Sequence, residues 1–187
     1  VPRPLPRMPV LAWGGGDLSL LTEIGFTHKL IWLTDYGRMW AAGEPTEAMA
    51  PDRAAEAGAM LDELLAHDLG GAVYLYPGRW IARHDSLSRV YGRIDRSGEL
   101  RTQDNVCASF PEVQSFAYDV GASVARTFGH YPALQASLVH SEIRDATSLC
   151  FHDHDRAAFV GAAGYEIPRD AVGKAGVRYS SIPGFPA

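Results

Sequence analysis

The chain has 187 residues, of which 47% are hydrophobic and 21% charged, and its formal net charge at pH 7 is −5. This composition is typical of a soluble globular domain with a substantial core. The negative charge argues against nucleic acid or an anionic membrane surface as the main partner. No apolar run approaches the roughly 20 residues that cross a bilayer, and no secretory signal is visible, which favours the cytoplasm.

Short apolar segments alternate with amphipathic helical patterns along the chain. The expected strands cover residues 10–13, 27–33, 72–76 and 133–139. The expected helices cover residues 18–24, 51–67, 110–128 and 155–163. Strands that alternate with helices in this way predict parallel βαβ units in an α/β fold.

Local signals mark where several of these elements begin and end. Asp17 is a suitable N-cap for the first helix, and Gly25 is placed as its C′ residue. Ser109 and Glu112 have the spacing of a capping box. The glycines at 14–16 predict a tight turn, because they lack the spacing of a phosphate-binding loop.

The prolines and glycines also suggest a domain organisation. Residues 1–9 read as a Pro-rich lead-in, residues 10–165 as the (β/α) portion, and residues 166–187 as a Gly/Pro-rich tail. The polar stretch 81–105 predicts an irregular excursion or a hairpin, with a turn at 96–98.

Ionisable and aromatic residues gather after the predicted strands, whereas residues after the helices look plain. Ligands of parallel α/β folds bind at the carboxyl ends of the strands. The predicted substrate-binding residues are therefore Asp35, Arg38, Trp40, Arg79, Trp80 and Ser141. Glu142 closes the fourth strand and is the predicted catalytic carboxylate. Trp13 is a further aromatic residue that can stack on a sugar ring.

A resemblance to a known family covers roughly residues 10–165. Phe110 and Pro111, the helix that follows, residues 130–134, the next strand and Ser141–Glu142 resemble the middle of clan A glycoside hydrolases. The nearest likeness is to family 42 β-galactosidases. The resemblance implies a TIM barrel, a β-linked sugar such as a β-galactoside as substrate, and Glu142 as the general acid/base of a retaining reaction.

The resemblance also implies a structural zinc ion. Family 42 enzymes hold zinc with four cysteines, and the matching positions here are Cys107, Cys150, His152 and Asp155. Zinc accepts sulfur, nitrogen and oxygen donors, so this set is chemically suitable. His154 can equally replace either neighbouring ligand. The alternative is a loop with two buried cysteines and no metal.

Two departures from the family pattern affect the expected chemistry. Ser141 stands where the clan usually has Asn, so contacts to the substrate must differ. The clan's nucleophile lies on the seventh strand, whereas this chain matches about the first four βα units. We therefore expect further sequence, a homo-oligomer or a complementary chain to complete the barrel.

Two other functions remain open at this stage. One is a catalytically inert relative that binds carbohydrate. The other is a compact, doubly wound α/β domain that binds a different small ligand at its strand ends.

Overall fold

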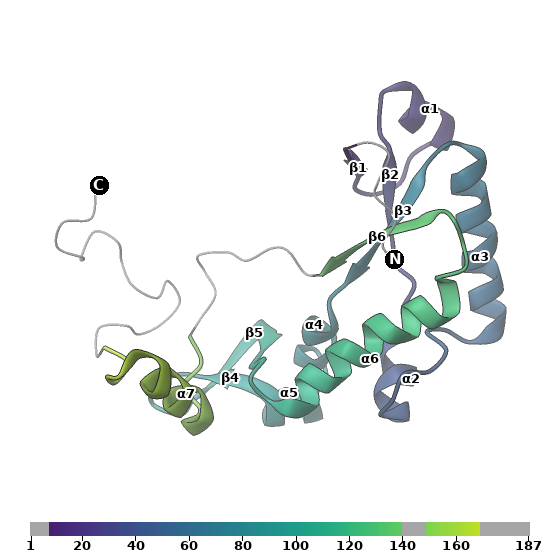
Figure 1. Ribbon diagram of the computed structural model, residues 1–187. Coiled ribbons are helices and arrows are strands. Elements are labelled where there is room, and N and C mark those ends of the chain that lie inside the picture. Colours follow the sequence, from purple (N-terminus) through teal and green to yellow (C-terminus); the bar gives the residue numbers. More distant parts are fainter. Residues whose placement is uncertain (1–7, 140–148, 169–187) are drawn as a thin grey trace, which may run out of the picture. The chain divides into compact units, whose positions relative to one another are not determined.

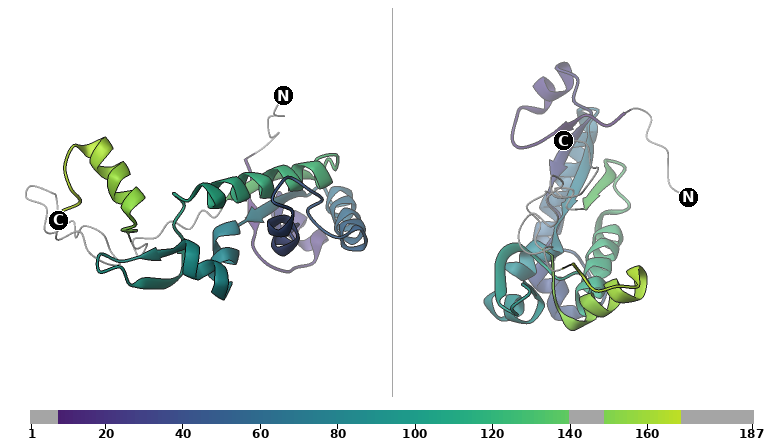
Figure 2. Two further views of the ribbon diagram at one scale, coloured as in Figure 1. Left: turned by 90° about the horizontal axis from the view of Figure 1, so that it is seen from below. Right: turned by 90° about the vertical axis from the view of Figure 1, so that its left-hand side faces the viewer.

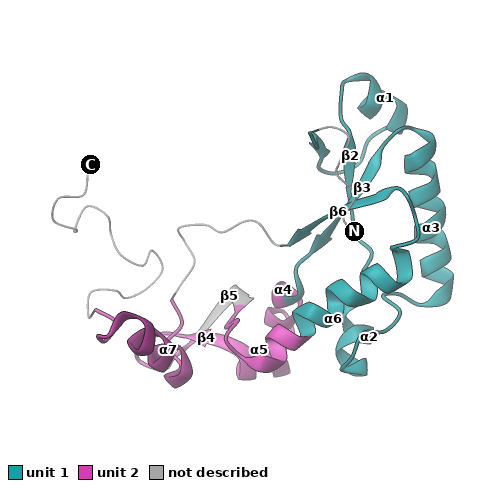
Figure 3. Cartoon of the chain, viewed as in Figure 1, with its two compact units in different colours: residues 1–77, 116–141 teal, residues 78–115, 142–187 magenta. Residues whose placement is uncertain are grey.

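The computed structural model describes residues 8–139 and 149–168. The chain divides into two compact units, coloured separately in Figure 3. Unit 1 comprises residues 1–77 and 116–141, and unit 2 comprises residues 78–115 and 142–187. The predicted candidates His140, Ser141, Glu142, Arg144 and Asp145 lie outside the described residues.

Unit 1 contains a sheet of four parallel strands. They are β1 (Leu11–Ala12), β2 (His28–Ile31), β3 (Gly70–Leu75) and β6 (Leu134–Val139). Their spatial order is β1-β2-β3-β6, so each strand pairs with the next parallel strand of the chain (Figure 1). The predicted α/β class with a parallel sheet is therefore confirmed.

The strand order bears on the two architectures that the sequence left open. A doubly wound sheet reverses its strand order at a switch point, and the four described parallel strands show no such reversal. A (β/α)8 barrel adds its strands one after another in chain order. The described strands form a singly wound, four-stranded parallel sheet, which is too small to be a closed barrel.

The first helix begins and ends as the sequence predicted. Helix α1 (Leu18–Glu23) has Asp17 as its N-cap, whose carboxylate accepts a hydrogen bond from the Leu20 amide at 2.9 Å. At its end the Phe26 amide donates to the Leu21 carbonyl, and the Gly25 amide donates to Thr22. This pair of bonds is a Schellman motif. It requires a left-handed residue at Gly25, where φ is 95°.

Residues 34–40, after the second predicted strand, show no long helical pattern and are expected to form a loop, but the structure has a helix there. Helix α2 (Tyr36–Ala42) starts at Asp35, whose carboxylate accepts a hydrogen bond from the Arg38 amide at 3.0 Å. Met39 is fully buried on its inner face, and Gly43 ends the helix with φ of 65°. The prediction of irregular structure was wrong because an N-cap and one apolar turn suffice for a short helix that packs on a core.

Helix α3 (Pro51–Ala66) covers one face of the sheet. Leu61 and Leu64 are fully buried. A Cβ atom at Gly71 of β3 would lie 2.7 Å from Ile31 Cδ1 and 3.2 Å from Leu61 Cδ2. Glycine at this position therefore allows α3 to approach the strands closely, and the predicted helix at 51–67 is confirmed.

The opposite face of the sheet carries the other half of the core. Leu30, Ala72 and Tyr74 are buried together there, and the partly buried side chains that pack against them are Leu11, Tyr76, Ala136 and Leu138. The last strand is less well covered, because Val139 of β6 is 70% exposed.

Helix α6 (Pro111–Phe128) begins in unit 2 and continues through unit 1. The amphipathic pattern of this helix predicts a buried face, and all of its predicted members except Ala117 are buried: Val113, Phe116, Val120, Val124 and Phe128. Two hydroxyl groups on α6 also bind the chain before α3. Ser123 accepts a hydrogen bond from the Thr46 amide at 3.0 Å, and Thr127 accepts one from the Ala48 amide at 2.8 Å.

Unit 2 is built from short elements, shown from further sides in Figure 2. They are α4 (Pro77–Ala82), α5 (Asp85–Tyr91), β4 (Gly92–Ile94), β5 (Leu100–Val106) and α7 (Asp153–Ala163). The antiparallel β4–β5 hairpin confirms the predicted hairpin, and Gly98 in its turn has φ of 86°. Helices α4 and α5 replace the irregular structure expected in the first part of this stretch.

Candidate metal centre

Four side chains of unit 2 bring potential metal ligands together. Cys107, Cys150, His152 and Asp155 each offer one ligand atom, and these four atoms all lie within 4.8 Å of one another. Cys107 Sγ lies 3.1 Å from Asp155 Oδ2, Cys150 Sγ lies 2.9 Å from His152 Nδ1, and His152 Nδ1 lies 3.6 Å from Asp155 Oδ2. These are the four residues that the sequence predicted.

The separations are close to those of a tetrahedral zinc site. Bond lengths of about 2.3 Å to sulfur and about 2.0 Å to nitrogen or oxygen place neighbouring donors about 3.3 to 3.8 Å apart. The two hydrogen-bonded pairs, Cys107–Asp155 at 3.1 Å and Cys150–His152 at 2.9 Å, are a few tenths of an ångström shorter than this range. No pair of donor atoms exceeds the range by more than about 1 Å. Small side-chain rotations are therefore enough to fit the donors around one ion.

The hairpin positions both cysteines. The Cys107 amide, directly after β5, donates a hydrogen bond to the Tyr91 carbonyl at 2.8 Å. Beside Cys150, the Phe151 amide donates to the Ile94 carbonyl of β4 at 3.1 Å. Phe151 is buried, and the Arg96 guanidinium lies 4.6 Å from the centroid of its ring. Main-chain bonds and one cation–π contact thus hold residues 150 and 151 on the hairpin.

Ser109 orients the carboxylate of the cluster. Its hydroxyl donates a hydrogen bond of 2.5 Å to Asp155 Oδ1, which leaves Oδ2 directed at the sulfur and nitrogen donors. Outer-shell hydrogen bonds of this kind fix metal ligands in place. The sequence singled out Ser109 only as part of a capping box, and nothing in the local spacing links it to residue 155.

Aromatic rings surround the two histidines. Phe110 packs edge-to-face against both His152 and His154, with centroid distances of 5.0 and 4.7 Å. The imidazoles of His152 and His154 stack nearly parallel, 5.1 Å apart. The Tyr91 ring also packs edge-to-face against Phe110, with the two centroids 5.3 Å apart. This packing limits the rotation of both imidazole rings.

The thiols and the carboxylate have shifted pKa values. Burial, and after it the hydrogen bond that the Cys107 thiol donates to Asp155, raises the pKa of Cys107 to about 12. Burial also raises the pKa of Cys150. Burial alone would raise the pKa of Asp155, but hydrogen bonds from Ser109, Cys107 and Cys150 outweigh it and lower that pKa. Without a metal, two thiols therefore share one carboxylate as their acceptor.

The predicted substrate residues after β2 have structural contacts. Asp35 caps α2, as described above. The Arg38 guanidinium Nε donates to the Glu47 carbonyl at 3.2 Å, and Trp40 packs edge-to-face on Phe116 at 4.9 Å.

Of the site residues predicted after β3 and β6, those after β3 lie within the described part of the chain and those after β6 lie outside it. Arg79 and Trp80 lie on α4 of unit 2, and the Trp80 ring lies 4.7 Å from that of His84. Ser141 and Glu142 lie beyond the last described residue of β6, so the structure does not place the predicted catalytic carboxylate.

Trp13 stands at the carboxyl end of β1. The residue is 63% exposed, and its ring packs edge-to-face against Tyr74 with the centroids 5.4 Å apart. Tyr74 contacts Tyr76, and Tyr76 contacts Tyr36. The sequence did not predict this row of rings, because its members come from three separate segments of the chain.

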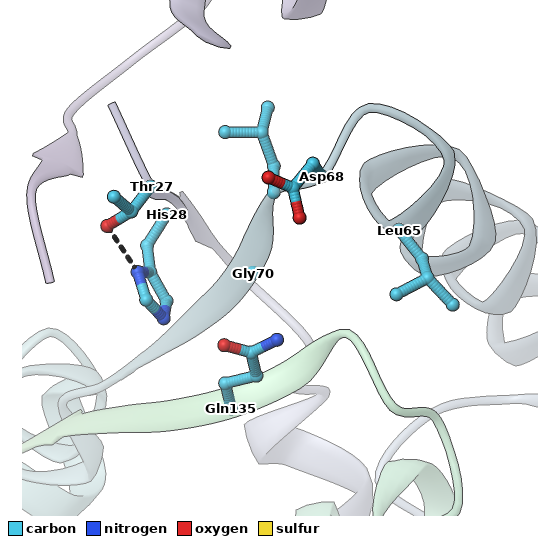
Figure 4. Close-up of a pocket in the computed structure, with 7 residues that line it drawn as sticks. Thr27, His28, Leu65, Asp68, Gly70 and Gln135 are labelled. Carbon is cyan, nitrogen blue, oxygen red and sulfur yellow. Dashed lines mark hydrogen bonds between the residues drawn. The ribbon is translucent and has the colours of Figure 1, made fainter. Parts of the chain in front are cut away.

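A small pocket of about 270 Å³ opens at the amino ends of β2 and β3 (Figure 4). Buried His28 lines it, and its Nδ1 lies 2.8 Å from the Thr27 hydroxyl. Gly70 is needed here, because a Cβ atom would lie 2.6 Å from His28 Cδ2 and 2.9 Å from Gln135 Oε1. The amino ends of parallel strands are commonly the stabilising face of such folds.

Comparisons with protein-family models, with characterised proteins and with solved structures find no match to this chain. No helix within the described ranges 8–139 and 149–168 is long and apolar enough to cross a membrane.

Proposed function

We propose that Cys107, Cys150, His152 and Asp155 bind a structural zinc ion. The observation that carries this proposal is the convergence of two sulfurs, one nitrogen and one oxygen within 4.8 Å. Thiolate and imidazole donors in a four-coordinate arrangement are typical of zinc in proteins. Calcium and magnesium are disfavoured, because both require mainly oxygen ligands.

The expected role is structural, because four protein donors leave no coordination position for a reacting water molecule. The ion would join the residue that follows β5 to the start of α7. The Ser109–Asp155 hydrogen bond and the contacts of Phe110 with His152 and His154 already link these segments, and the ion would add direct bonds to them. Zinc binding would therefore stabilise unit 2 and fix the chain directly after residue 149.

A competition titration with a chromophoric zinc chelator tests the site. Asp155→Asn removes a ligand and should weaken zinc binding by more than the roughly 100-fold typical of losing an outer-shell partner. Asp153→Asn is the matched control, because Asp153 is exposed two residues earlier on the same helix. Equal affinity of the two variants would contradict the assignment.

The wider activity that we propose is hydrolysis of β-linked glycosides, with Glu142 as the general acid/base. Two features support it: the singly wound order of four parallel strands, and the place of Glu142 in sequence, just after the carboxyl end of β6. Active sites of (β/α)8 barrels lie at that end of the strands. A β-galactoside is the substrate that the sequence resemblance suggests.

A retaining reaction needs a second carboxyl group about 5 Å from the first. In this proposal Glu142 protonates the leaving oxygen, and a nucleophilic carboxylate attacks the anomeric carbon. Water then releases the sugar, with Glu142 acting as the base. We assign the nucleophile to a strand outside this sequence, on the same polypeptide or on a partner chain, so the assay must use the complete assembly.

The direct test is turnover of a nitrophenyl β-galactoside by the complete assembly. Glu142→Gln should reduce turnover by a factor of 100 or more, since general acid catalysis contributes roughly 10²- to 10⁴-fold. Glu23→Gln is the control, because Glu23 is an exposed carboxylate at the end of α1. Undiminished turnover in Glu142→Gln would overturn the assignment of the acid/base.

A second candidate is carbohydrate binding without hydrolysis. The exposed ring of Trp13, supported by Tyr74, favours it because apolar sugar faces stack on such rings. Ser141 in place of the clan's usual Asn also points this way. Saturable sugar binding that survives Glu142→Gln, in a protein that never turns over glycosides, would establish this alternative.

A further inference from the structure

A fifth donor lies beside the four that form the cluster. His154 Nε2 lies 3.5 Å from Cys107 Sγ and 3.6 Å from Asp155 Oδ2. Both distances match the spacing of neighbouring donors around a tetrahedral zinc ion, about 3.3 to 3.8 Å. His154 is therefore placed to share an ion with Cys107 and Asp155, as His152 is placed to share one with Cys150 and Asp155.

The two histidines differ in exposure. The side chain of His154 is 40% exposed, whereas those of His152 and Asp155 are 18% and 14% exposed. Cys107 is buried. His154 is therefore the more exposed of the two nitrogen donors, and its neighbours Cys107 and Asp155 are better protected from solvent.

Both imidazoles are held in defined orientations. They stack with an angle of 7° between their planes, and Phe110 packs edge-to-face against both. His152 Nδ1 and His154 Nε2 each lie 3.6 Å from the same carboxylate oxygen, Asp155 Oδ2. Occupation by one imidazole leaves the other within reach of the ion.

We propose that the site has five donors, that His152 and His154 alternate as the nitrogen ligand, and that the exposed His154 makes the bound ion exchangeable. The inference rests on the proposed zinc site. Zinc passes readily between four and five ligands, so an arriving donor can enter before another leaves. A site closed by four buried ligands lacks this route, and its ion exchanges slowly.

The experiment uses the full chain loaded with Co²⁺, whose visible spectrum distinguishes four-coordinate from five-coordinate ions. Transfer of the metal to a chelator is followed in wild type, His152→Ala, His154→Ala and the double variant. His130→Ala is the control, because His130 is an exposed histidine of unit 1. Circular dichroism confirms that each variant is folded.

The proposal predicts that each single variant still binds one ion, because the remaining histidine serves as ligand. His154→Ala should release the ion several-fold more slowly than wild type and show only the four-coordinate spectrum. The double variant should bind at least about 100-fold more weakly than either single variant, beyond the usual effect of an outer-shell residue.

Either of two results would overturn the five-donor proposal, and only the second would also overturn the zinc site. If wild type binds metal while His152→Ala does not, and His154→Ala releases it at the wild-type rate, the zinc site stands but His154 is no ligand. If wild type binds neither Co²⁺ nor Zn²⁺, the zinc site and the five-donor inference both fail.

Discussion

At the scale of single residues, the cluster shows how a carboxylate is prepared for a metal ion. Asp155 accepts hydrogen bonds from Ser109 on one oxygen and from Cys107 on the other. Replacing the thiol proton by a metal ion keeps the carboxylate in the same position. The metal-free arrangement is therefore close to the arrangement that would bind the ion.

Removing the Ser109 hydroxyl should weaken metal binding without abolishing it. Ser109→Ala leaves all ligands in place but frees Asp155 to rotate, so we expect zinc affinity to fall by about 10- to 100-fold. Ser115→Ala, on the exposed side of the first half of α6, should have no effect. Competition with a chelator measures both, and a Ser109→Ala affinity equal to wild type would remove Ser109 from the site.

Metal affinity should rise steeply with pH. The pKa values of Cys107 and Cys150 are both raised, so both thiols are protonated at neutral pH and must release a proton to the solvent when the ion binds. Asp155 contributes no such proton there, since its pKa is lowered. Between about pH 7 and 8.5 the apparent affinity should gain about 100-fold per pH unit, tenfold for each thiol. An affinity that is flat over this range would show that the thiols do not ligate as thiolates.

At the scale of elements, local chemistry predicted the ends of some helices well. Asp17 marks the start of α1 and Gly25 its end, because side-chain capping and a left-handed glycine both act within one helical turn. The short helices α2, α4 and α5 were missed. They have no long amphipathic stripe, and packing rather than periodicity decides their structure.

Close approach of α3 to the sheet makes Gly71 a sensitive position. In Gly71→Ala the new methyl group would press on Ile31 and Leu61, and overpacking of this kind typically costs about 1 to 3 kcal/mol. Gly121→Ala is the opposite case, because nothing lies within 4 Å of a Cβ atom there on α6. It should stabilise the helix by up to about 1 kcal/mol. Urea unfolding compares the two, and equal stability would contradict the described packing.

At the scale of the whole molecule, the sequence predicted the parallel α/β class and the composition of the cluster. Alternating strands and helices are visible in the sequence because the middle strands, β2 and β3, are largely buried on both faces and read as short apolar runs. The cluster was predicted through a resemblance that aligned Cys107 with residues 150–155. The separation into two units, the ring row from Trp13 to Tyr36 and the Ser109–Asp155 bond depend on contacts between distant segments, which no local pattern records.

The native mass of the purified chain, measured before and after chelation, tests the central claim most directly. We predict a mass that exceeds the polypeptide by one zinc ion, which chelation removes and added zinc restores. A bare polypeptide mass that stays unchanged when zinc is supplied at neutral pH would contradict the metal centre. It would leave Cys107 as a buried thiol and Cys150 as a partly buried thiol, with no metal between them.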